Sequence, residues 1–294
     1  MNFPVFKRYS SIVVILAACI VSGIQTDAIA QMDRKRADPG GPVDELFLTP
    51  KIVISSSVQN LDARNWNFTI MHVFGKLNGG IQSLWGMDDP ANIRFGLDYG
   101  ITDRLSLGVG RSRLDKLYDF RAKWNVLRQT KDNAIPIEIA LVGDVGIMSV
   151  ANGFEFIDRL NYFGSILLAR RMSDKISLQI TGMVSHFNTV FGETDGGVPV
   201  SLEQNTHYAI GFAMRYLLTE QISLLAEYLP VLGERTTDTV DAFAIAVNFE
   251  TGGHVFQLFL KTSQWLTEQH VMARNSESFA DGDIRFGFVI NRVF

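Results

Sequence analysis

The sequence has 294 residues, of which 47% are hydrophobic and 20% are charged, so it encodes a folded chain and not an intrinsically disordered one. Its formal net charge of −4 excludes a typical nucleic-acid-binding protein. The 25 glycines and 21 phenylalanines, against only 8 prolines, favour many strands joined by turns.

Residues 1–30 have the three regions of a secretory signal peptide. Lys7 and Arg8 precede an apolar run from Ile12 to Val21, and Ala28-Ile29-Ala30 forms a small-residue cleavage site. The apolar run is shorter than the roughly 20 residues that a membrane-spanning helix needs. The sequence therefore predicts export and cleavage near Ala30.

Cys19, the only cysteine, lies within this signal peptide. The preceding Leu16-Ala17-Ala18 resembles a lipobox, which would make Cys19 a site of lipidation. Ile20 and Val21 continue the apolar region instead of ending it, so simple cleavage at Ala30 is favoured over lipidation. Cleavage leaves a mature chain with no thiol, no disulfide and no cysteine-ligated metal.

Residues 31–65 are polar and irregular. They include the charged run 33–36, the Pro- and Gly-containing run 38–42, and a short extended-looking piece from Lys51 to Ile54. This composition fits either a periplasmic tail or a partial plug, and a flexible linker fits equally well.

Residues 66–294 follow a different pattern, in which apolar residues alternate with small or charged ones. The alternation divides into about twelve segments, each of roughly the 9 to 11 residues that a tilted membrane strand requires. The segments begin near Trp66, Ala91, Leu105, Leu117, Ile135, Arg159, Ile176, Thr206, Ile222, Val240, His254 and Gly282. This predicts an all-β fold, a transmembrane antiparallel up-and-down β-barrel of about twelve strands.

The connections between these segments differ in length at the two ends of the predicted barrel. A similar turn motif occurs at residues 102–107, 173–178 and 219–224, each time after an even-numbered strand. Long loops, at residues 75–90, 188–205 and 263–281, follow odd-numbered strands. Outer-membrane barrels have short periplasmic turns and longer extracellular loops. The pattern therefore predicts the bilayer of the outer membrane as a partner, with both chain ends on the periplasmic side.

The last segment, Ile284 to Phe294, alternates and ends in an aromatic residue. It resembles the C-terminal signal recognised by the barrel-assembly machinery, which would be contacted through Phe294. Arg292 departs from that signal, but a long side chain near the membrane edge can reach the polar interface.

Charged residues at inward-facing positions are the candidate lumen lining. They are Arg94, Asp98, Arg121, Lys123, Glu138, Asp144, Arg171, Arg215, Glu227, Lys261 and Arg285. Because both signs occur in similar numbers, a mutually paired network is favoured over a substrate path.

Several stretches of the chain resemble an uncharacterised family of Gram-negative outer-membrane β-barrels, a domain-of-unknown-function family. The stretches are His72–Gly75, Ala91–Arg104, Gly108–Ser112, Thr251–Leu258 and Phe286–Phe294. The resemblance implies the barrel fold and the outer membrane, and it implies no substrate, cofactor or catalytic residue.

The sequence gives no sign of an enzyme. The five histidines lack metal-ligand spacing, so neither a metal nor another cofactor is expected. Ser185-His186 invites comparison with membrane-embedded lipid hydrolases, but adjacent residues of a strand face opposite sides and cannot pair. His72 and His186 are expected on the outer wall.

The charged inner face favours a channel or transporter for small polar solutes. The alternative is a closed structural or binding barrel that acts through its extracellular loops, and a lipid hydrolase is less well supported. The sequence identifies no ligand.

Overall fold

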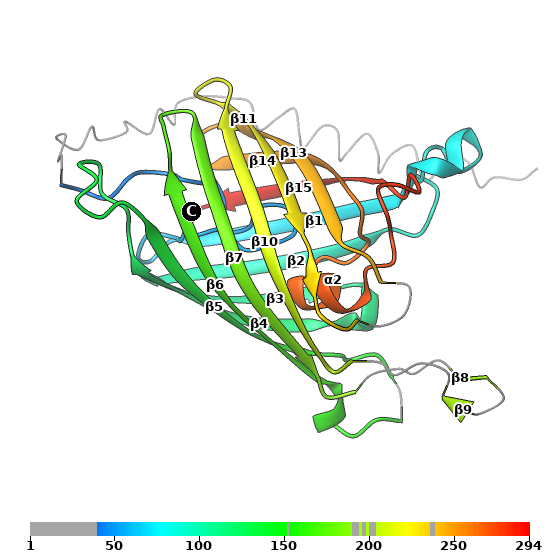
Figure 1. Ribbon diagram of the computed structural model, residues 1–294. Helices are drawn as coiled ribbons and strands as arrows, with labels where there is room; N and C mark the ends of the chain where they lie inside the picture. Colours follow the sequence, from blue (N-terminus) through cyan, green and yellow to red (C-terminus); the bar gives the residue numbers. More distant parts are fainter. Residues whose placement is uncertain (1–39, 152, 190–193, 196–197, 200–203, 236–238) are drawn as a thin grey trace, which may run out of the picture. The chain divides into compact units, whose positions relative to one another are not determined.

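The computed structural model describes residues 40–151, 153–189, 194–195, 198–199, 204–235 and 239–294 (Figure 1). The signal peptide predicted over residues 1–30, including Cys19, lies outside the described residues, and so do residues 31–39. Within the described part, no helix combines the length and apolar character needed to cross a membrane.

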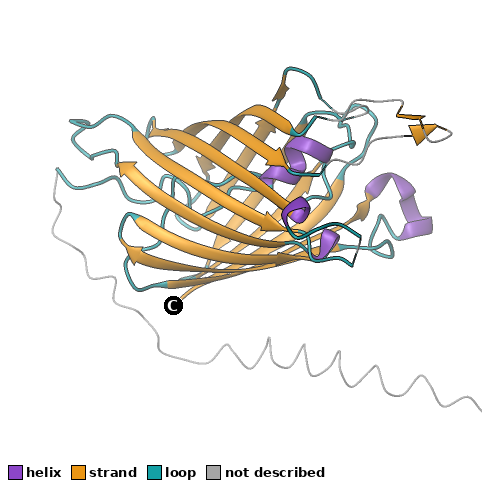
Figure 2. Ribbon diagram, turned by 90° about the horizontal axis from the view of Figure 1, so that it is seen from below, coloured by secondary structure: helices purple, strands orange, loops and turns teal. Residues whose placement is uncertain are grey.

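Twelve long strands of the described chain form one closed antiparallel sheet (Figures 1 and 2). Eleven pairs join strands that follow one another, and β15 pairs with β1 to close the barrel. The strands are β1 (Trp66–Lys76), β2 (Asn92–Thr102), β3 (Leu105–Ser112), β4 (Tyr118–Leu127), β5 (Glu138–Ile147), β6 (Leu160–Arg171), β7 (Ile176–Phe187), β10 (Thr206–Leu217), β11 (Ile222–Leu229), β13 (Ala242–Glu250), β14 (His254–Lys261) and β15 (Arg285–Val293). Closure gives every strand two partners, which an apolar membrane interior demands.

The predicted fold class is therefore confirmed, and the strand starts agree closely. The largest differences occur at β5 and β15, which begin at Glu138 and Arg285 where the alternation predicts Ile135 and Gly282. Each difference is three residues, because the alternation continues into the residues that precede the paired part of the strand.

Smaller elements complete the described chain. The two-residue strand β12 (Val231–Leu232) adds to the sheet by pairing with β10, and β8 (Thr194–Asp195) pairs with β9 (Val198–Pro199) in a separate hairpin. Short 3-10 turns span Leu77–Ser83, Leu114–Lys116 and Ile157–Arg159, and the helix α2 (Glu268–Arg274) lies between β14 and β15.

The two-residue period of a strand separates an inner from an outer face. In β6, Asn161 and Ser165 are buried, whereas Tyr162, Ile166 and Leu168 are 37%, 53% and 40% exposed. Large apolar side chains on the outside of a membrane barrel face the lipid, while smaller and polar ones face inward.

The repeated turn motif has one structure in all three places. The hydroxyl oxygens of Thr102, Ser173 and Thr219 each accept hydrogen bonds from the backbone N–H groups two and three residues later. These bonds hold tight connections between strands. All three turns follow even-numbered barrel strands, as the sequence predicts, and they mark one end of the barrel, called here the short-turn end.

The barrel interior is filled by chain segments from both ends. Residues 43–61, called here the inner segment, are buried at Leu46, Phe47, Ile52, Ile54 and Val58, none of which is more than 2% exposed. From the opposite end, the loop between β14 and β15 brings α2 against the inner side of β6, β7 and β10 (Figure 1).

The inner segment enters and leaves at the same end of the barrel. At its start, Val43 donates its N–H to the carbonyl of Gln129, in the connection between β4 and β5. Just after its end, Ala63 donates its N–H to Asp103, in the turn between β2 and β3. Both connections lie at the short-turn end, so the segment folds into the barrel and back without crossing it.

Candidate functional site

The structure places most of the predicted lumen-lining residues inside the barrel. Eight are no more than 9% exposed: Arg94, Lys123, Glu138, Asp144, Arg215, Glu227, Lys261 and Arg285. The Arg121 side chain is also 9% exposed, and Asp98 and Arg171 are half-buried.

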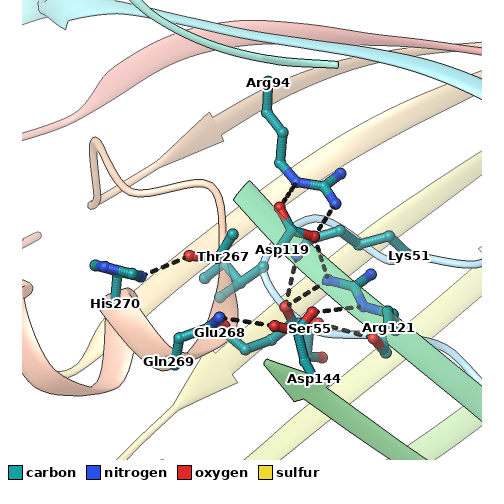
Figure 3. A network of polar contacts seen from close by, with 12 residues as sticks. Lys51, Ser55, Arg94, Asp119, Arg121, Asp144, Thr267, Glu268, Gln269 and His270 are labelled. Atoms are coloured by element: carbon teal, nitrogen blue, oxygen red, sulfur yellow. Dashed lines mark hydrogen bonds and ion pairs between the residues drawn. The ribbon is translucent and has the colours of Figure 1, made fainter. Parts of the chain in front are cut away.

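Five charged side chains, Arg94, Asp119, Arg121, Asp144 and Glu268, meet in one ion network inside the barrel (Figure 3). The guanidinium of Arg94 donates to the Asp119 carboxylate through Nε, at 3.0 Å, and through a second nitrogen. Arg121 lies beside three carboxylates, at 3.4 Å from Asp144, 3.4 Å from Glu268 and 4.0 Å from Asp119. Gly110 leaves the space for this pairing, because a Cβ atom there would lie 2.0 Å from Arg94 and 2.5 Å from Asp119.

Glu268 joins the wall, the loop helix and the inner segment. This residue begins α2, and its fully buried carboxylate accepts hydrogen bonds from Lys51 Nζ at 2.9 Å and Ser56 Oγ at 2.8 Å. Burial alone would raise the pKa of Glu268, but the charges of Lys51 and Arg121 hold it well below its usual range. The carboxylate therefore remains ionised, and the two segments that fill the barrel are held together through it.

The rest of the loop packs around His270, which is fully buried. Its Nδ1 lies 2.9 Å from Thr267 Oγ1, and the Trp265 ring stacks on it with the centroids 5.0 Å apart. Burial lowers the pKa of His270 to about 3, so its imidazole is neutral at physiological pH. Trp265 therefore packs within the loop, whereas Trp85 is 49% exposed.

A second set of contacts joins the wall to the main chain of the inner segment. The Glu227 carboxylate accepts the N–H groups of Val53, Ile54 and Ser55 at 3.1, 2.7 and 2.8 Å. Gln179 both accepts and donates a hydrogen bond to the main chain of the same segment. Its Oε1 accepts the N–H of Val58 at 3.0 Å, and its Nε2 donates to the carbonyl of Ser56 at 2.8 Å.

Four more wall side chains donate to backbone carbonyls of the inner segment. The contacts are Lys123 Nζ to Pro50 (2.7 Å) and Gln59 (2.9 Å), Asn125 Nδ2 to Val58 (2.8 Å), Gln257 Nε2 to Ile52 (2.8 Å) and Arg215 Nη1 to Glu45 (2.6 Å). These donors come from β4, β14 and β10. The inner segment is thus held from several sides.

Sequence reasoning missed several members of the site. Asp119, Asn125, Gln179 and Gln257 occupy inward positions of the alternation, so the same period that selected Lys123 could have identified them. No such signal exists for Glu268, because it lies in a loop whose position depends on contacts with the wall.

The two faces also separate the residues considered for a hydrolase. Ser185 is 1% exposed and faces the interior, whereas His186 lies on the outer face with Nδ1 2.8 Å from Thr206 Oγ1. His72 is on the outer face as well, where its ring stacks on Phe288. Across the described residues, no three His, Cys, Asp or Glu side chains form a cluster able to hold a metal ion.

A family model, the membrane bound beta barrel domain (DUF5777), matches residues 47–294. The chain belongs to this family. The family resemblance stated from the sequence is thereby confirmed, and the match begins inside the inner segment. Most of that segment, from Phe47 onward, is therefore part of the membrane bound beta barrel domain.

Solved structures with a similar fold are distant from this beta barrel domain. A KdgM porin is 8% identical with a TM-score of 0.49, covering 78% of this chain and 99% of its own. A NanC porin is 6% identical with a TM-score of 0.48, covering 77% and 98%. An outer membrane channel from Pseudomonas putida F1 is 13% identical with a TM-score of 0.47, covering 80% and 97%. These similarities are too distant to assign a function. Among curated proteins, none matches the sequence.

Proposed function

We propose that this chain is an outer-membrane channel for small polar solutes, and that the inner segment and α2 close it in the conformation described here. The observation that carries the proposal is that segments of the chain itself, and not side chains of the wall alone, fill the interior. The wall contributes polar and charged side chains to the interior, and the space they surround is occupied by chain that enters from the ends. A lumen wide enough for a folded-back peptide has room for a small solute once the peptide leaves.

The sorting of connections by length supports the outer membrane as the location. Four of the five connections at the end where the inner segment enters are short, and most of the longer loops, including the one that carries α2, are at the other end. With short turns in the periplasm, the inner segment is reached from the periplasm and α2 from outside the cell. Cleavage near Ala30 and recognition of Phe294 by the barrel-assembly machinery belong to the same proposal.

In the open channel, the predicted lumen residues would face the solute. Arg94, Arg121 and Lys123 would supply positive charge, and Asp144 and Glu227 negative charge. These side chains now bind other charges of the wall, α2 or the inner segment. Because both signs line the wall, we expect weak selectivity for the sign of a solute's charge.

Single-channel conductance in a planar bilayer tests the proposal. The refolded mature chain, with heat-modifiable mobility as the sign of a folded barrel, is compared with the double variant Ile54→Asp/Val58→Asp, which places two charges at fully buried positions of the inner segment. We expect rare openings from the natural chain and frequent ones from the variant. The control Asp44→Asn alters an exposed side chain of the same segment and should match the natural chain. A double variant that stays folded and opens no more often than the natural chain contradicts the proposal that the inner segment closes a channel.

The filled interior also favours one alternative, a closed barrel that binds a partner through its extracellular loops. Contacts such as that of Lys51 with the buried Glu268 carboxylate stabilise a closed form. Under this alternative, displacing the inner segment produces no current, and truncating the exposed loop at residues 77–90 abolishes partner binding instead.

A further inference from the structure

The wall contacts the inner segment mainly through the segment's main chain. Six wall residues hydrogen-bond backbone groups between Glu45 and Gln59: Lys123, Asn125, Gln179, Arg215, Glu227 and Gln257. Among the hydrogen bonds of the described chain, only the Ser55 hydroxyl joins a side chain of the inner segment directly to a side chain of the wall, at Glu227. Lys51 and Ser56 use their side chains on α2.

Such contacts do not depend on the identity of the side chains they hold. Every residue except proline carries the same N–H and C=O groups, and a surface that binds these groups accepts peptides of different sequence that can adopt the same backbone conformation. Glu227 and Gln179 illustrate this well. One carboxylate binds three consecutive N–H groups, and one amide binds a carbonyl and an N–H two residues apart.

The wall also provides apolar surface between these polar groups. The buried cluster of the interior includes Ile52 and Ile54 from the inner segment together with Met71, Leu167 and Phe259 from the wall. A ligand that fits the interior would therefore combine a main chain folded into a turn, as in residues 51–56, with apolar side chains, which is the chemistry of a short apolar peptide.

We infer that the barrel interior is a binding site for short peptides that adopt a folded-back conformation, occupied in cis by residues 45–59, and that peptides with apolar side chains are the solutes that compete for it. The statement that peptides are transported solutes rests on the proposed channel. Peptide binding inside the barrel does not require transport. The inner segment then acts as a tethered competitor whose effective concentration is about millimolar, so an added peptide binds the natural chain weakly.

The first test is binding of a fluorescent synthetic peptide with the sequence of residues 43–61, measured by anisotropy in detergent. The full mature chain is compared with Ile54→Asp/Val58→Asp, and with the milder Ile54→Ser in case the double variant fails to fold. We expect the peptide to bind the variants at least about tenfold more tightly than the natural chain, because their own segment competes less. A peptide of the same composition in permuted order should bind nearly as well. Equal, negligible binding to all folded variants would overturn the inference.

A matched peptide tests whether the main chain is what the wall recognises. N-methylation at the positions of Val53, Ile54 and Ser55 keeps every side chain and removes the three donors to Glu227. The methylated peptide should bind about tenfold or more weakly, since these hydrogen bonds go to a charged acceptor. In a Glu227→Ala background the two peptides should bind alike. The inference is wrong if methylation does not weaken peptide binding to the barrel that retains Glu227. It is also wrong if methylation weakens binding equally in the Glu227→Ala background.

Conductance separates failure of this inference from failure of the channel. Peptide that binds the variants and blocks their current supports both. Peptide that binds variants without current supports the binding site and contradicts the channel. Current that the peptide neither blocks nor reduces, with no binding by anisotropy, supports the channel and contradicts the peptide site.

Discussion

Replacing Glu268 by Gln should release the inner segment from the loop helix while leaving the barrel wall intact. The side chain is fully buried and accepts from Lys51, Ser56 and Arg121. Arg121 keeps Asp144 and Asp119 as partners, but Lys51 forms no other ion pair among the described residues. Removing one member of a buried ion pair costs about 3 to 5 kcal/mol. We take the lower end, because Arg121 remains compensated.

A loss of about 3 kcal/mol in docking raises the undocked population by roughly 100-fold. Hydrogen exchange of the Val53, Ile54 and Ser55 amides, all bonded to Glu227, reports that population directly and should accelerate by about the same factor. The control Glu277→Gln breaks an ion pair with Arg285 in the same loop and should leave these amides unchanged. Unaltered exchange in Glu268→Gln, with the strand amides equally protected, would show that the carboxylate does not hold the segment.

Three further predictions concern pH, packing and the wall. His270 is buried neutral with its pKa lowered to about 3, so protonation favours the undocked loop, and docking should weaken as pH falls below about 6.5. The protection factors of the α2 amides, which are corrected for the intrinsic pH dependence of exchange, should fall between pH 7 and 5 in the natural chain and stay constant in His270→Gln. The same fall in both proteins would refute the role of His270. Gly110→Ala should destabilise the barrel by about 1 to 3 kcal/mol in chemical unfolding, because its Cβ would meet Arg94 and Asp119. The control Gly182→Ala, whose Cβ would have no atom within 4 Å, should not destabilise it. Equal unfolding midpoints for the two variants would contradict the close-packing argument. Lys123→Met removes both donors to the carbonyls of Pro50 and Gln59 and should increase proteolysis of the inner segment in a folded barrel, whereas cleavage at the natural rate would show that these bonds do not anchor it.

The barrel could be predicted from the sequence because each strand of a two-faced wall alternates inward and outward side chains, and this two-residue period is visible within each segment alone. Arg94 and Asp144 could be placed inside for the same reason. The structure of the inner segment was not accessible, because it depends on distant contacts such as Val53 to Glu227, 174 residues apart. The helix α2 has seven residues, too few to be stable without the wall. Its first residue, Glu268, was therefore absent from the predicted lining.

The path of the inner segment has a consequence for how quickly the interior can be emptied. Since the segment enters and leaves at the short-turn end, it is not threaded through the closed ring of strands. The loop that carries α2 likewise begins and ends at one rim, between β14 and β15. Either segment can withdraw while all twelve strand pairs, including the β15 to β1 seam, stay intact. The activation barrier for clearing the lumen is then set by the hydrogen bonds and apolar contacts that hold each segment to the wall, and not by the far slower unfolding of the barrel.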